Sequence, residues 1–245
     1  ENLPFRFDTR GIIYNKRAHV YKVNIRTKKF SKIIDGDAKE IISIESLVEG
    51  DRGLVLSYDQ YNSKGTMLEE KIGAIEGSKI KEIYSQGSMG NLFYYEDGLH
   101  AVGMRKRFDW PTNTTVLKIS NTGKVSYKYH SFDRNIVKAE VNEAILYFLY
   151  EDSGKTLLRD GTNNVDLINS DVTIKDFAFN NEQTFVIANS FSNPDEIYEL
   201  NNGQLTKISK ANEFFTKKVK TWDCQYKRID TGKSEIDTWG IFVGK

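Results

Sequence analysis

A block of four short β-strands recurs four times along this chain. In the clearest copy the predicted strands are Met89–Tyr95, Leu99–Arg107, Thr114–Ser120 and Lys124–His130. The four copies begin near Ile41, Met89, Asn135 and Val172. Units spaced by roughly 37 to 48 residues, with four strands each, are typical of β-propeller blades. A single blade cannot bury both of its faces, so such units must stack on one another.

Composition agrees with an all-β fold and narrows the choice of partners. Aromatic residues make up 12% of the 245 residues, and only three prolines interrupt the chain. Thirty-five basic residues against 34 acidic ones give a net charge of +1. This balance argues against nucleic acid or an anionic membrane as the main partner. No apolar run approaches the roughly 18 residues of a membrane span. A single cysteine is consistent with a reducing compartment, so we expect a cytoplasmic protein.

The repeat predicts the domain boundaries. We expect a β-propeller over residues 1–211, with a partial blade over 1–40, and a terminal hairpin over 212–245. The complete four-stranded antiparallel blades would cover residues 41–85, 89–131, 135–170 and 172–210. In the third of these, Ala144–Tyr150 is a run of apolar residues that predicts a strand buried on both faces.

After Lys210 the pattern changes. Lys217–Ile229 alternates like one long strand, and Glu235–Val243 like its hairpin partner. Trp222 and Trp239 lie on its aromatic side, which has no blade partner in the repeat. An apolar surface of this kind usually marks an interface, so we expect it to contact a further domain.

The end of the last blade resembles a known family. Ser192–Leu200, Gly203, Leu205-Thr206 and Asn212 resemble the final propeller blade of prolyl oligopeptidase-family serine peptidases, in the acylaminoacyl-peptidase style. The hairpin with Trp239-Gly240 resembles that family's lead-in to its α/β-hydrolase domain. This resemblance implies a catalytic hydrolase domain that is absent from these 245 residues.

Two functions follow as alternatives. The first is a non-catalytic propeller of a serine peptidase, which gates the access of short peptides to a hydrolase domain of the same polypeptide. The second is a free-standing propeller that binds a protein partner. The chain has no Gly-x-Ser-x-Gly nucleophile elbow, and Gln86–Gly90 is the nearest miss. We therefore predict no catalytic residue, cofactor or metal site, and an inactive isolated chain.

A few residues remain as candidate contacts with substrate or with a further domain. Arg105, Arg107 and Trp110 combine carboxylate-binding groups with a large flat side chain, and Trp222 and Trp239 are the hairpin candidates. His19, His100 and His130 are interpreted as partly buried strand residues, and Asp35-Gly36-Asp37 as a turn between blades. An open strand in the partial blade would favour pairing with a second copy, so a homo-oligomer remains an alternative.

Overall fold

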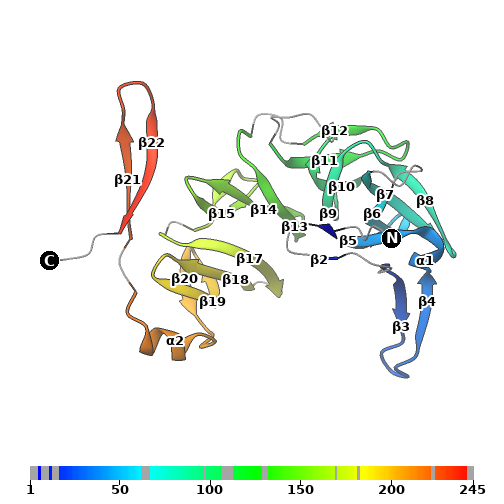
Figure 1. The fold of residues 1–245 in the computed structure, drawn as a ribbon, viewed down its shortest axis with the longest axis horizontal. Helices are drawn as coiled ribbons and strands as arrows, with labels where there is room; N and C mark the ends of the chain where they lie inside the picture. Colours follow the sequence, from blue (N-terminus) through cyan, green and yellow to red (C-terminus); the bar gives the residue numbers. More distant parts are fainter. Residues whose placement is uncertain are drawn as a thin grey trace. The chain divides into compact units, whose positions relative to one another are not determined.

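The computed structural model shows an all-β chain, with two short helices among the residues that it describes (Figure 1). Its described residues are 5–6, 11–12, 17–61, 67–96, 98–105, 113–128, 132–168, 170–180, 183–221 and 224–241. The chain forms two compact units, residues 1–130 and 131–245, each of which contains two four-stranded sheets. The four complete antiparallel blades expected from the repeat are therefore confirmed.

The first unit contains two blades whose strands pair in chain order. One blade consists of β5 (Ile41–Gly50), β6 (Gly53–Tyr61), β7 (Leu68–Glu76) and β8 (Lys79–Tyr84). The other consists of β9 (Ser88–Tyr95), β10 (Gly98–Met104), β11 (Thr115–Ile119) and β12 (Val125–Tyr127). Their facing surfaces enclose an apolar core in which Leu99, Leu117 and Ile119 are fully buried. This is the burial that a blade obtains only from a neighbour.

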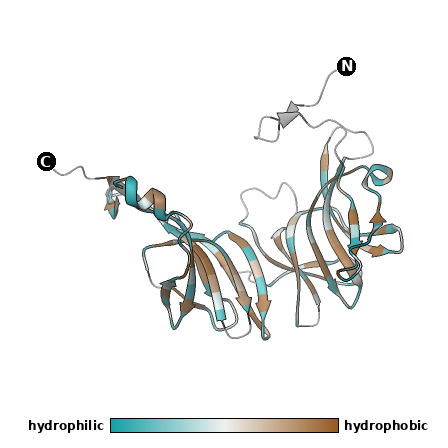
Figure 2. Ribbon diagram, turned by 90° about the horizontal axis from the view of Figure 1, so that it is seen from below, coloured by the Kyte–Doolittle hydropathy of each residue, from teal (hydrophilic) through white to brown (hydrophobic). Residues whose placement is uncertain are grey.

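The second unit repeats this plan. One blade consists of β13 (Ile136–Asn142), β14 (Ile145–Asp152), β15 (Lys155–Asp160) and β16 (Val165–Asp166). The next consists of β17 (Thr173–Asn180), β18 (Gln183–Ser190), β19 (Asn193–Asn201) and β20 (Gln204–Lys207). Leu149 and Leu158 of the first blade pack with Ile174, Phe177 and Val186 of the second. Figure 2 shows hydrophobic residues concentrated along the strands and hydrophilic residues at many of the turns.

Strand β14 begins one residue later than the sequence predicts. Leu146, Phe148, Leu149 and Tyr150 are buried, as expected for a strand between neighbours. Ala144, however, lies in the turn before the strand, where Glu143 and Ala144 have φ of 49° and 63°. Two left-handed residues in succession are the geometry of the tight hairpin turn that matches strand twist. Apolar character alone could not separate Ala144 from the strand.

In the described residues of the partial blade expected over 1–40, the paired strands form two separate two-stranded sheets. β3 (Val20–Val23) pairs with β4 (Phe30–Ile34), whereas β1 (Phe5–Arg6) pairs with β2 (Gly11–Ile12) in a separate sheet. A short helix, α1 (Gly36–Lys39), then leads into β5. The segment Asp35-Gly36-Asp37 is therefore the start of a helix, capped by the Asp35 carboxylate, and not a plain turn.

The prediction of a strand from Lys217 is wrong. Residues Glu213–Lys218 form helix α2, and the terminal hairpin consists of β21 (Cys224–Asp230) and β22 (Glu235–Ile241). An ion pair of 2.8 Å joins Glu213 and Lys217 one turn apart, a spacing that favours a helix. Among the described residues, no helix is long and apolar enough to cross a membrane.

Candidate functional site

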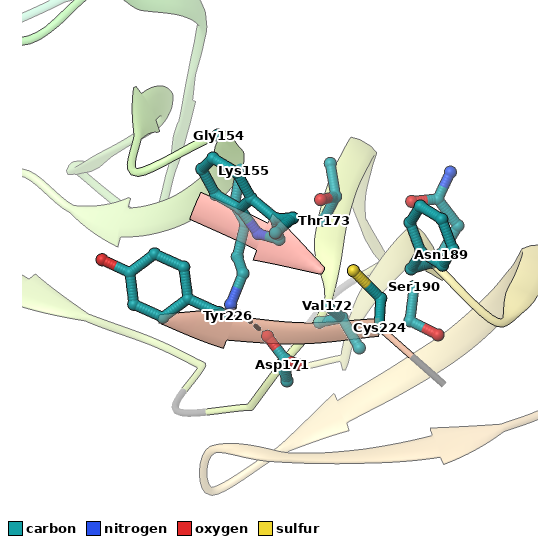
Figure 3. Close-up of a pocket in the computed structure, with 11 residues that line it drawn as sticks. Gly154, Lys155, Asp171, Val172, Thr173, Asn189, Ser190, Cys224 and Tyr226 are labelled. Atoms are coloured by element: carbon teal, nitrogen blue, oxygen red, sulfur yellow. Dashed lines mark hydrogen bonds and ion pairs between the residues drawn. The ribbon is translucent and has the colours of Figure 1, made fainter. Parts of the chain in front are cut away.

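A pocket of the second unit lies between the terminal hairpin and one end of its two blades (Figure 3). In an antiparallel blade, the turn from the second to the third strand lies at the end where the chain also leaves the fourth strand. The β14–β15 turn, the start of β17 and the β18–β19 turn all supply residues to the pocket. The hairpin that follows β20 supplies Cys224, Tyr226 and Trp239. The chain order thus brings hairpin and turns together, around a volume of about 320 Å³.

A glycine in the β14–β15 turn seats the hairpin. Gly154 has φ of +71°, a left-handed conformation that suits a residue without a Cβ. A Cβ built on Gly154 would lie 2.6 Å from two ring atoms of Trp239. The indole ring therefore rests directly on the backbone of this turn. The expectation that the aromatic side has no blade partner in this chain is wrong for Trp239.

The charges that line the pocket compensate each other. Lys155 forms an ion pair with Asp171, and its ammonium group lies 6.0 Å from the centre of the Tyr226 ring. Figure 3 shows the Lys155 amine directed at the Asp171 carboxylate beside this ring. The cation thus contacts both a carboxylate and an aromatic face, and the pocket carries no net charge from this pair.

Polar contacts within the hairpin hold its aromatic residues in place. Tyr226 and Trp239 face each other across the two strands, with ring centres 5.4 Å apart. The Tyr226 hydroxyl donates to the Asp237 carboxylate at 2.5 Å, and Arg228 Nε donates to it at 3.0 Å. The hydrogen bond from Tyr226, followed by that from Arg228, lowers the pKa of Asp237 below its usual value. The Tyr226 ring is therefore fixed beside Lys155.

A buried carboxylate fixes the chain where it leaves the last blade. Glu196 lies on β19 with a side chain only 1% exposed. It accepts hydrogen bonds from the Ser209 hydroxyl and from the backbone N–H groups of Ala211 and Asn212, the latter two at 3.0 and 2.9 Å. Lys207 Nζ lies 3.2 Å away. The hydrogen bond from Ser209, with those from Asn212 and the other donors, lowers the pKa of Glu196 to about 2.

In the sequence, Glu196 and Asn212 stand out only as parts of the family-like pattern at the end of the last blade. The structure gives them a physical role, because Asn212 Nδ2 also donates to the Asp195 carbonyl at 2.6 Å. The sequence signal for this role was a glutamate within an alternating strand, followed by a serine and an asparagine at the end of the blade. Gly154 gave no signal beyond that of an ordinary turn residue.

The predicted contact residues are only partly described. Arg105 stacks its guanidinium over the ring of Tyr127, 5.4 Å from the ring centre, and its carbonyl accepts from the Tyr84 hydroxyl. Trp239 lies at the pocket, as stated above. Arg107, Trp110 and Trp222 lie outside the described residues. Arg105 belongs to the first unit and Trp239 to the second.

One cluster has metal-ligand residue types. His19, Asp35 and Asp37 each offer one ligand atom, and these atoms lie within 4.8 Å of one another. However, His19 Nδ1 already accepts the Gly36 N–H at 3.0 Å, and Asp35 accepts the Asp37 N–H at 3.2 Å. A metal at Nε2 would require the proton on Nδ1, which conflicts with that hydrogen bond. The arrangement fits a capped helix start better than a metal centre.

Of the three histidines, two lie in the described part of the chain. His100 is fully buried on β10, stacked on Phe93, with Nδ1 3.0 Å from the Gly98 carbonyl. His100 is therefore a strand residue as expected, but it is fully buried and not partly buried. His19 precedes β3 instead of lying in it, and His130 is outside the described residues.

Comparison with known proteins identifies the architecture. No protein-family model and no curated protein sequence matches the chain. Among solved structures, the uncomplexed acylaminoacyl peptidase of Pyrococcus horikoshii aligns with 98% of this chain at 15% identity and a TM-score of 0.72. The chain has a β-propeller fold. It spans 38% of the length of that peptidase.

Two further solved structures align with less of the chain. The β-propeller domain of the trilobed protease from Pyrococcus furiosus aligns with 79% of this chain and 76% of that domain, at 12% identity and a TM-score of 0.51. A puromycin-hydrolysing peptidase of Mycobacterium tuberculosis aligns with 80% of this chain and 33% of its own length, at 12% identity and a TM-score of 0.54. The alignment with the Pyrococcus horikoshii peptidase covers 98% of the chain, so it includes the terminal hairpin as well as the blades.

Proposed function

We propose that this chain is the non-catalytic propeller portion of a serine peptidase of the acylaminoacyl or prolyl oligopeptidase type. The observation that carries the proposal is the extent of the likeness to acylaminoacyl peptidase. It includes the hairpin after the last blade, which a free-standing propeller would not need. The docked hairpin and the Glu196 hydrogen bonds give the chain a defined exit from the last blade, which supports a role in placing a domain that follows.

The role proposed for the propeller is steric. A ring of blades with a narrow axial opening admits short or unfolded peptides and excludes folded chains from a chamber behind it. No catalytic serine is assigned to this chain, because it lacks the Gly-x-Ser-x-Gly elbow. The nucleophile, its histidine and its acid would belong to a hydrolase domain of the same polypeptide, and the substrates would be short peptides.

The test compares the product of the complete reading frame with residues 1–245 alone. We expect a fluorophosphonate probe for serine hydrolases to label the complete product and not the 245-residue chain. The complete product should cleave short peptide substrates and spare the same sequences embedded in a folded protein. A complete product that the probe does not label would refute the peptidase assignment. Equal cleavage of peptides and folded proteins would refute the gating role.

A further inference from the structure

We propose that the pocket between the terminal hairpin and the last two blades binds a neutral aromatic side chain of a peptide. The peptide as the source of this side chain rests on the proposed function, whereas the pocket and its chemistry do not. The pocket holds about 320 Å³, which is at the small end of the range for ligand sites and suits one large side chain with its flanking amides.

Partly exposed aromatic residues from two separate elements meet at this pocket. Tyr226 and Trp239 come from the hairpin and are 38% and 42% exposed, although Trp239 rests on Gly154. Phe191 comes from the β18–β19 turn and is 61% exposed. Aromatic rings that surround one volume and remain accessible are the usual anchors of a binding site. A further ring placed among them would gain offset or edge contacts with each wall.

The polar lining selects against a charged ligand. Lys155 and Asp171 already neutralise each other. Asn189 Nδ2 donates to Asp195 at 2.6 Å, and Ser190 Oγ accepts from Asn193 at 2.9 Å. Within the described part of the chain, no hydrogen bond occupies the Asn189 carbonyl oxygen or the Ser190 hydroxyl hydrogen, and these two groups match the N–H and C=O groups of an amide. A charged side chain would enter without a counter-ion, at a desolvation cost.

Cys224 provides a direct measure of occupancy, because it lines the pocket and is the chain's single cysteine. The probe is N-acetyl-L-phenylalaninamide, with N-acetylglycinamide and N-acetyl-L-lysinamide as matched controls. A ligand of this size is expected to bind with a Kd on the order of 1 mM. At about 10 mM it should slow the alkylation of Cys224 by N-ethylmaleimide about tenfold, by simple occupancy. The two control amides should have little effect.

A pair of glycine variants tests whether the docked hairpin forms the pocket. Gly154→Ala places a methyl group against the Trp239 ring, whereas Gly77→Ala has a similar φ of +64° and nothing within 4 Å of the new Cβ. Both carry the same left-handed strain, so only the first should abolish protection of Cys224. Equal protection by all three amides, or no protection by the phenylalanine probe, would overturn the proposal. So would protection that survives Gly154→Ala. None of these readouts depends on peptidase activity, so the pocket and the proposed function can fail separately.

Discussion

Replacing Trp239 by alanine should release the terminal hairpin from the blades without unfolding them. Trp239 is 42% exposed, so more than half of its side chain is buried. A fully buried aromatic side chain removes at most about 250 Å² of surface from water. At about 25 cal/mol per Å², the buried part corresponds to about 3.5 kcal/mol, which is an upper bound. Part of this area is covered by Tyr226 within the hairpin itself. We therefore expect the variant to weaken docking by about 2–3 kcal/mol.

Hydrogen exchange with mass spectrometry measures this loss locally. The amides of β21 and β22 should exchange roughly 30- to 150-fold faster in Trp239→Ala, since about 1.4 kcal/mol corresponds to a tenfold change. The melting temperature of the blades should change by less than about 3 °C, because the hairpin is not part of either blade core.

The matched control is Ile229→Ala, which truncates an apolar hairpin residue that is 49% exposed and does not line the pocket. It should leave exchange in the hairpin within a few-fold of the wild type. If both variants accelerate exchange equally, the contact between Trp239 and Gly154 does not hold the hairpin. A fall in melting temperature of about 10 °C for Trp239→Ala would instead make the hairpin an integral part of the propeller.

Three further predictions concern the blades. The pKa of Glu196 is about 2 in the folded chain, against an ordinary 4.5. The contribution of Glu196 to the stability of the fold should therefore be fully present above pH 4.5 and be lost as the pH falls towards 2. Glu196→Gln should remove this part of the pH dependence in urea titrations. Burial lowers the pKa of His100 below 6.5, so the stability of the fold should fall as the pH drops below 6.5. His100→Phe should reduce this dependence of stability on pH. An unchanged pH dependence would assign the effect to another group. Phe148→Ala should cost about 3–5 kcal/mol and about 10 °C in melting temperature, because Phe148 is 1% exposed in the sheet of β13–β16; calorimetry showing a loss below 1 kcal/mol would contradict its place in the core.

The repeat of strands and turns was predictable because its signals are local. Alternation of apolar residues and turn residues such as Gly123 and Gly203, both with positive φ, mark each blade without reference to its neighbours. Boundaries were less certain where the signal was ambiguous. Ala144 is apolar like the strand that follows it, but it lies in the turn before that strand. Lys217 belongs to an alternating segment, but it lies in a helix, where it pairs with Glu213.

The candidate site depends on contacts between segments that lie far apart in the sequence. Trp239 was recognisable as an aromatic residue on one side of a hairpin. Its partner, Gly154, is separated from it in the sequence by strands β15 to β20, helix α2 and strand β21. Glu196 was visible only as part of a pattern, until the fold placed Ser209 and the N–H groups of Ala211 and Asn212 around its carboxylate. The sequence by itself determined the blades, because period and turn chemistry act over a few residues. Only the tertiary structure decided the pocket and the exit of the chain, because close packing and hydrogen bonding between distant segments exist only once the chain has folded.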